Sequence, residues 1–142
     1  MRPAFVLDAS VAVGWLLAEP EAQHAKRIAD RMRDEDAIVP ANWSLEVCNA
    51  VRKASRTGRI TLDDQTRLAQ IIRSLPILVE PTDLERDWVS VLPLAQRLEL
   101  SAYDASYLEL AMRLGIPLAT IDEEIAARAR SLGVAVIPAR VP

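Results

Sequence analysis

The chain has 142 residues, of which 51% are hydrophobic and 26% charged, and its formal net charge is −3. This length suits a single domain that buries one core, so we expect one domain over residues 1–142. The single histidine, His24, and the single cysteine, Cys48, exclude an intrachain disulfide and provide too few ligands for a zinc site.

Short apolar runs alternate with longer helical patterns from one end of the chain to the other. The helical patterns predict seven helices, over residues 11–18, 21–33, 41–55, 61–74, 84–98, 102–114 and 122–132. The apolar runs predict five short strands, over residues 4–7, 37–39, 77–79, 116–121 and 135–137. Pro93 should kink or split the fifth helix, and Ser10 and Thr61 should cap the first and the fourth.

The predicted strands are continuously apolar, which is typical of a mostly parallel sheet covered by helices on both faces. The expected fold class is therefore α/β. No stretch approaches the ~18 apolar residues of a membrane span, and no signal peptide precedes the first strand. We therefore expect a cytoplasmic protein that does not enter a membrane.

Four carboxylates are predicted to gather at one edge of this sheet. Asp8 ends the first strand and Asp122 ends the fourth, while Asp104 and Glu46 lie near the starts of helices that begin at the same edge. Ligands of parallel α/β sheets bind at the carboxyl ends of the strands. Asp104 heads an otherwise apolar stripe of its helix and Glu46 borders the apolar face of another, so both should be partly buried.

Several carboxylates in one partly buried place repel each other unless protons or cations neutralise their charge. Mg²⁺ or Mn²⁺ suits such a group because both ions prefer oxygen ligands. Each acid taken alone has a structural alternative, since Asp104 and Asp122 could belong to helix caps, Asp8 could precede a cap and Glu46 could be solvated. The residues alone leave both interpretations open.

Other chemistries that place an acid after the first strand fit less well. A phosphoaspartyl phosphatase requires a second Asp two residues after Asp8, where the chain has Ser10, and a receiver domain requires a late lysine that this chain lacks. The four glycines form no phosphate-cradling motif. A phosphoprotein stays a third hypothesis, which labelling of Asp8 by acetyl phosphate would test.

The acids and their neighbours form motifs at residues 6–11, 40–50, 102–111 and 118–122. Together these motifs resemble those of the PIN-domain ribonucleases, and the chain length and closing segment resemble the VapC type of toxin. The resemblance covers essentially the whole chain. It implies a three-layer α/β/α sandwich around a central, mostly parallel sheet.

The resemblance further implies a Mg²⁺- or Mn²⁺-dependent endoribonuclease that acts as the toxin of a type II toxin–antitoxin system. The catalytic and metal-binding acids would be Asp8, Glu46, Asp104 and Asp122, with supporting hydroxyls from Ser10 and Thr120. Similar toxins form homodimers and are inhibited by an antitoxin whose C-terminal segment lies in a groove beside the active site. Metal-activated water would hydrolyse an RNA phosphodiester and leave a 5′-phosphate. The alternative is a PIN-like module that binds RNA or a protein without cutting.

The charge of −3 argues at first sight against an RNA partner. Without the four proposed metal ligands this charge becomes +1, so the acidic balance comes from the site itself. Six basic residues between 52 and 73 form either a track for the phosphate backbone or ordinary solvated helix faces. We expect His24 at the surface and, in the core, Cys48 and the tryptophans Trp15, Trp43 and Trp88.

Overall fold

Five short parallel strands form the centre of the molecule in the computed structural model, which describes residues 2–19 and 22–137. The strands are β1 (Phe5–Leu7), β2 (Ala37–Pro40), β3 (Ile77–Glu80), β4 (Leu118–Ala119) and β5 (Val136–Ile137). Their order in the sheet is β3-β2-β1-β4-β5, and Val6 of β1 is in register with Ile38 and Leu118 of its two neighbours. The expected five-stranded parallel sheet is therefore confirmed.

The strand order places a topological switch point between β1 and β4. The chain runs outward from β1 through β2 to β3 and then returns to β4 on the other side of β1. In open α/β sheets the crevice outside the carboxyl ends of two such strands is where ligands bind. Asp8 follows β1 directly and Thr120 follows β4 directly, so both lie at this crevice.

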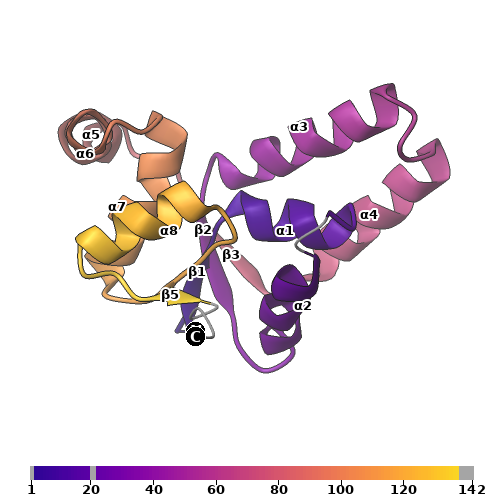
Figure 1. Cartoon of the computed structure of the whole chain (residues 1–142), viewed down its shortest axis with the longest axis horizontal. Coiled ribbons are helices and arrows are strands. Elements are labelled where there is room, and N and C mark those ends of the chain that lie inside the picture. The colour runs from indigo at the N-terminus through magenta and orange to yellow at the C-terminus, as the bar shows by residue number, and fades with distance from the viewer. Residues whose placement is uncertain (1, 20–21, 138–142) are drawn as a thin grey trace.

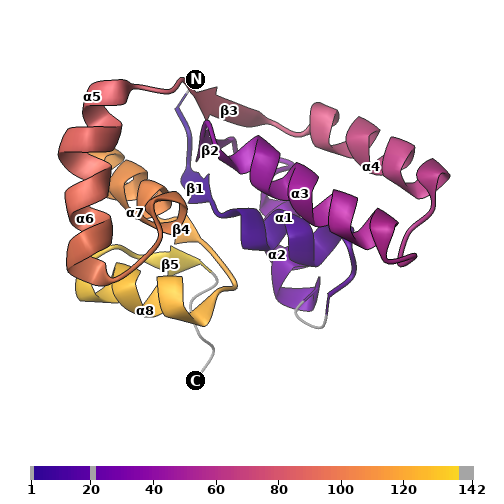
Figure 2. The same cartoon turned by 90° about the horizontal axis from the view of Figure 1, so that it is seen from above.

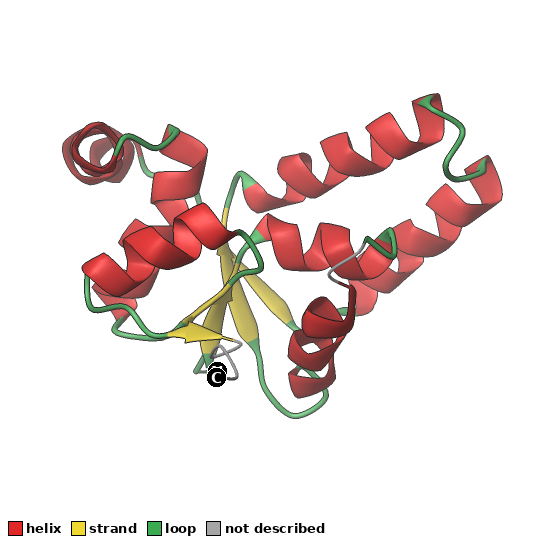
Figure 3. Cartoon of the chain, in the orientation of Figure 1, coloured by secondary structure: helices red, strands yellow, loops and turns green. Residues whose placement is uncertain are grey.

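Helices cover both faces of the sheet, which confirms the expected three-layer sandwich (Figure 3). On one side lie four helices, of which the last two project as a hairpin (Figure 1): α1 (Ala9–Leu16), α2 (Ala22–Arg31), α3 (Trp43–Arg56) and α4 (Leu62–Ser74). On the other side lie α7 (Ala102–Leu114), α8 (Glu123–Ser131) and a broken helix over residues 84–98 (Figure 2).

The broken helix contains the split that Pro93 predicts. It consists of α5 (Leu84–Arg86), a π-helical turn η1 (Asp87–Val91) and α6 (Leu92–Leu98). Pro93 lies in the first turn of α6, where the missing N–H of a proline is tolerated. The helical path therefore continues past Pro93, but with a wider turn immediately before it.

The remaining helices and strands differ from the expected ranges mainly at their ends. The first helix begins at Ala9, so Asp8 occupies the N-cap position and Ser10 lies inside the helix instead of capping it. The Ser10 hydroxyl donates to the Asp8 side chain. The fourth strand covers only Leu118–Ala119 of the expected 116–121. Before it, Pro117 accepts from the Val6 N–H but has no N–H of its own to give to the sheet. The start expected for the second helix, residue 21, lies outside the described residues.

The core is built around β1, in which all three residues are inaccessible to solvent. Trp43 is 2% exposed and Trp15 packs partly buried against the core, as expected for both. His24 is exposed, also as expected. Within the described ranges, no helix combines the length and the apolar character needed to cross a membrane.

Two residues expected in the core lie at the surface instead. Cys48 is exposed on α3, and Trp88 is 69% exposed in η1. In each case a neighbouring valine, Val47 or Val91, takes the buried position of that turn. An apolar residue on a helix is buried only if its own face meets the core, so the expectation from residue type alone is wrong for both.

Candidate active site

Asp8 lies at the switch point of the sheet, and only 3% of its surface is exposed. Its Oδ2 atom accepts hydrogen bonds from the Ser10 hydroxyl at 2.6 Å and from the Thr120 hydroxyl at 2.7 Å. Ser10 belongs to α1 and Thr120 follows β4, so the two hydroxyls join both sides of the crevice. They orient the carboxylate, while Oδ1 accepts no hydrogen bond among the described residues.

The surroundings of Asp8 make its negative charge costly. Burial raises the pKa of Asp8 from 3.8 to about 6. The hydrogen bonds from Ser10 and Thr120 oppose this increase, and the charges of Asp104 and Asp122 add to it. A buried carboxylate next to two others gains most from a nearby cation, which would favour its charged form.

Asp122 caps α8, as the structural alternative for this residue predicts. Its Oδ1 atom accepts hydrogen bonds from the N–H groups of Glu124 at 2.9 Å and Ile125 at 3.0 Å. Its own N–H donates to the Thr120 hydroxyl at 3.0 Å, which ties the cap to the residue that orients Asp8. Both cap bonds use the same oxygen, Oδ1. Although Asp122 serves as a cap, its charge acts on the site, because it raises the pKa of Asp8 and of Asp104.

Asp104 lies in the first turn of α7 and is half-buried. The side chain of Ser101 caps this helix by accepting a hydrogen bond from the Asp104 N–H at 3.1 Å. Burial raises the pKa of Asp104, and the charges of Asp122 and Glu46 raise it further. Asp104 therefore lies within electrostatic reach of the other three acids.

Glu46 lies in the first turn of α3, at the boundary of the core as expected. Its Oε2 atom accepts hydrogen bonds from the Asn42 amide at 2.6 Å and from the Tyr107 hydroxyl at 2.7 Å. Burial, followed by the contact with Glu46, raises the pKa of Tyr107 far above its usual range, so its hydroxyl stays a donor.

Neither Asn42 nor Tyr107 is among the site residues expected from the sequence. The spacing of four residues between Asn42 and Glu46 on a predicted helix is a signal that could have found the first. Nothing in the sequence marks the second contact, because Tyr107 and Glu46 are 61 positions apart.

The four acids share one edge of the sheet without forming a closed ligand set. In the part of the chain that the structure describes, no three Asp, Glu, His or Cys side chains converge closely enough to hold a metal ion as they stand. Like charges oppose closer approach. Burial raises the pKa values of Asp8 and Asp104, and the charges of neighbouring acids add to this increase. The chemistry of the donors nevertheless fits a hard divalent cation, because all four provide carboxylate oxygens.

A groove separates α3 from α4, and we call it the α3–α4 groove. Of the six basic residues considered as a phosphate track, Arg59 pairs with Glu19 and Arg67 pairs with Asp64. Three others line the groove together with apolar side chains: Arg52, Arg56 and Arg73 beside Val47, Val51, Leu68 and Ile72. The sixth, Lys53, is exposed outside the groove lining. The basic charge of this region is thus divided among ion pairs, the groove and one exposed lysine.

Comparison with known proteins adds independent information about this arrangement. The model of the PIN domain matches residues 5–131. Ribonuclease VapC12 of Mycobacterium tuberculosis is 32% identical over 126 residues, which cover 85% of this chain and 88% of that protein. Ribonuclease VapC9 of the same species is 33% identical over 119 residues, or 82% of this chain and 84% of that protein. The crystal structure of PAE2754 from Pyrobaculum aerophilum has a TM-score of 0.69 at 28% identity, and the match covers 96% of this chain and 92% of that one.

Proposed function

Because this chain belongs to the PIN-domain family and, within it, to the VapC ribonucleases, we propose that it cleaves RNA as the toxin of a type II toxin–antitoxin system. We further propose that the reaction requires Mg²⁺, or Mn²⁺ in its place. The observation that carries the proposal is the buried Asp8 carboxylate at the switch point, oriented by two hydroxyls and close to Asp104 and Asp122.

We assign Asp8 and Asp104 as the closest ligands of the cation, with Asp122 and Glu46 completing its shell directly or through water. When bound, the cation lowers the pKa of a water molecule and stabilises negative charge on the phosphodiester. Ser10 and Thr120 support Asp8 by donating to one oxygen and leaving the other free to bind.

The proposed reaction is hydrolysis within an RNA strand. The water gives up a proton as its oxygen bonds to phosphorus, the bond from phosphorus to the 3′ oxygen breaks, and the 3′ oxygen takes up a proton, so no net proton is consumed in forming the 3′-hydroxyl. One fragment then carries a 5′-phosphate and the other a 3′-hydroxyl. Four unneutralised carboxylates would repel the phosphodiester, so the acids also make productive RNA binding depend on the divalent ion.

Cleavage of a panel of structured RNAs by the purified protein tests this function. We expect products with Mg²⁺ or Mn²⁺ and none with EDTA. The double variant Asp8→Asn, Asp104→Asn should lose more than about 100-fold in rate because it removes two proposed ligands. Asp63→Asn is the matched control, since Asp63 is an exposed acid in the first turn of α4 and should leave the rate unchanged.

Three results would contradict the assignment. Cleavage that persists in EDTA or in the double variant would show that other residues carry the reaction. RNA binding without any product would identify the chain as a PIN-like binding module. A covalent label on Asp8 from acetyl phosphate would favour a phosphoprotein.

We place the antitoxin segment in the α3–α4 groove. A groove lined by apolar side chains and by three arginines suits a segment that carries both apolar and acidic side chains. Val47 of the groove is the neighbour of Glu46, so a segment bound there would reach the edge of the proposed active site. This supports inhibition by a partner that lies beside the acids.

We also propose a homodimer, formed through what we call the α5–α6 patch: Leu84, Trp88, Val89 and Leu92. These four large apolar side chains are exposed on the broken helix. Exposed apolar patches of this kind mark interaction surfaces, and contact between the same patch on two copies closes a two-fold dimer. We propose the cytoplasm as the location, where RNA is available, and a single domain over residues 1–142.

A further inference from the structure

Two side chains from different parts of the fold hold one oxygen of the Glu46 carboxylate. Oε2 accepts a hydrogen bond of 2.6 Å from the Asn42 amide and one of 2.7 Å from the Tyr107 hydroxyl. Both bonds fall on the same atom, and Oε1 accepts no side-chain hydrogen bond among the described residues. Hydrogen bonds to a charged acceptor are short and strong, and two of them restrict rotation of the carboxylate.

Tyr107 is a rigid donor because its side chain is completely buried. It lies one turn after Asp104 on α7, so this helix supplies one acid of the site and a donor to another. A buried tyrosine usually finds some partner for its hydroxyl. Here the partner is a carboxylate of the proposed active site rather than a backbone carbonyl of the core.

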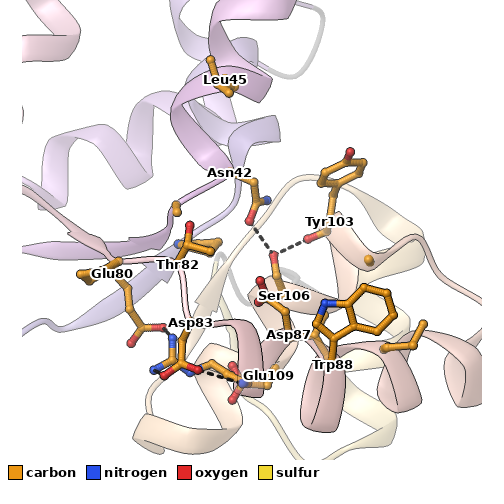
Figure 4. Close-up of a pocket in the computed structure, with 17 residues that line it drawn as sticks. Asn42, Leu45, Glu80, Thr82, Asp83, Asp87, Trp88, Tyr103, Ser106 and Glu109 are labelled. Carbon is orange, nitrogen blue, oxygen red and sulfur yellow. Dashed lines mark hydrogen bonds and ion pairs between the residues drawn. The ribbon is translucent and has the colours of Figure 1, made fainter.

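Asn42 is the second donor, and its amide is not needed by the helix that it precedes. It occupies the N-cap position of α3 but makes no side-chain cap hydrogen bond. The Ser106 hydroxyl donates to the Tyr103 carbonyl at 2.5 Å and lies 3.3 Å from Asn42 Oδ1, so α7 also contacts this amide (Figure 4). The NH₂ end of the amide is therefore turned toward Glu46.

We propose that Tyr107 and Asn42 are positioning residues, which hold Glu46 by Oε2 and leave Oε1 to the divalent cation. This inference rests on the proposed function, because it assigns Glu46 to the shell of the cation. Removal of a residue that orients a metal ligand typically weakens metal binding by about 10- to 100-fold. A merely structural role predicts a less stable protein with unchanged metal affinity.

The affinity of the full chain for Mn²⁺, measured by isothermal titration calorimetry, tests this inference without relying on RNA cleavage. Tyr107→Phe deletes one hydroxyl and keeps the buried ring, and it should raise the Kd for Mn²⁺ about 10-fold. Asn42→Ala should also raise the Kd for Mn²⁺, and it provides the test if Tyr107→Phe folds poorly. Tyr103→Phe is the matched control, because Tyr103 is the other tyrosine of α7, is 62% exposed and should leave the Kd unchanged.

A Glu46→Gln background shows whether the effect passes through Glu46. There, Tyr107→Phe should produce no further change in Mn²⁺ affinity. If the wild-type chain binds Mn²⁺ and neither Tyr107→Phe nor Asn42→Ala changes the Kd, the inference is overturned and the proposed function stands. If the wild-type chain neither binds Mn²⁺ nor cleaves RNA, both are overturned.

Discussion

At the scale of single residues, Asp8 combines the strongest burial of any acid in the site with the proposed central role. Its charge is opposed by burial and by Asp104 and Asp122, and it is favoured by the hydroxyls of Ser10 and Thr120. Residues that bind a cation are often kept in surroundings that destabilise the free protein. The metal-free protein should therefore become more stable when this charge is removed.

Asp8→Asn should abolish metal-dependent cleavage and stabilise the metal-free protein at neutral pH. The pKa of Asp8 in the folded chain is about 6, above the ordinary value of 3.8, so the folded chain binds the proton more tightly than the unfolded chain. Protonation of Asp8 therefore stabilises the folded wild-type chain. This contribution is complete below pH 3.8 and is lost as the pH rises through 6. At neutral pH the variant should exceed the wild type by about 1–3 kcal/mol in free energy of unfolding.

Urea unfolding in EDTA, at neutral pH and near the ordinary pKa of aspartate, measures this difference. The variant should exceed the wild type in free energy of unfolding by a large amount at neutral pH and by a small amount in acid. Added Mg²⁺ should reduce this difference at neutral pH, because the ion stabilises only a chain that binds it. An advantage that is the same at both pH values would contradict a buried, proton-binding Asp8.

At the scale of elements, two helix caps with the same chemistry lie in different places. Ser101 accepts a hydrogen bond from the Asp104 N–H at 3.1 Å, and Thr61 accepts one from the Asp64 N–H at 3.1 Å. The cap that the sequence predicts at Thr61 is confirmed, and Asp64 completes it by accepting from the Thr61 N–H at 2.9 Å. Only the Ser101 cap begins a helix that carries a proposed metal ligand.

Ser101→Ala and Thr61→Ala should each lower the free energy of unfolding by about 1 kcal/mol, which is the usual value of a side-chain cap. Ser101→Ala should also lower kcat/KM for RNA, because the first turn of α7 then holds Asp104 less firmly. Thr61→Ala is its control and should leave kcat/KM unchanged. Urea unfolding and RNA cleavage measure the two effects, and equal effects on cleavage would contradict a role for the Ser101 cap in the site.

At the scale of the whole molecule, the sheet separates two surfaces with different proposed partners. The α3–α4 groove lies in the helical layer that contains α1 and α2, whereas the α5–α6 patch lies in the opposite layer with α7 and α8 (Figure 2). Antitoxin binding and dimer formation would therefore use separate faces. A change in one surface should leave the other interaction intact.

Trp88→Asp should convert the proposed dimer into a monomer, because it places a charge in the middle of the α5–α6 patch. Sedimentation velocity should give about twice the chain mass of 15.7 kDa for the wild type and about that mass for the variant. Leu62→Asp is the control, since Leu62 is 74% exposed on α4, outside the patch. A wild-type chain that is monomeric at all concentrations would contradict the dimer.

Local patterns of residues were enough to predict the α/β alternation, the approximate position of each helix and strand, and the edge at which the acids lie. These features follow from local patterns, because periodicity identifies an element and the end of a strand in a parallel sheet fixes the edge. The roles of Ser10 and Thr120 beside Asp8 came only from the resemblance to the PIN-domain ribonucleases. Recognition of the family rested on these local motifs together.

The packing of the folded chain determines which side chains meet across the fold and which face solvent. Ser10 donates to Asp8 instead of capping α1, Tyr107 reaches Glu46 from another helix, and Trp88 points outward. The first depends on where α1 begins, because Ser10 lies inside the helix and its hydroxyl meets the Asp8 carboxylate. The others depend on how a helix is rotated against its neighbours. That rotation is set by packing of the whole core, so no local pattern of residues contains it.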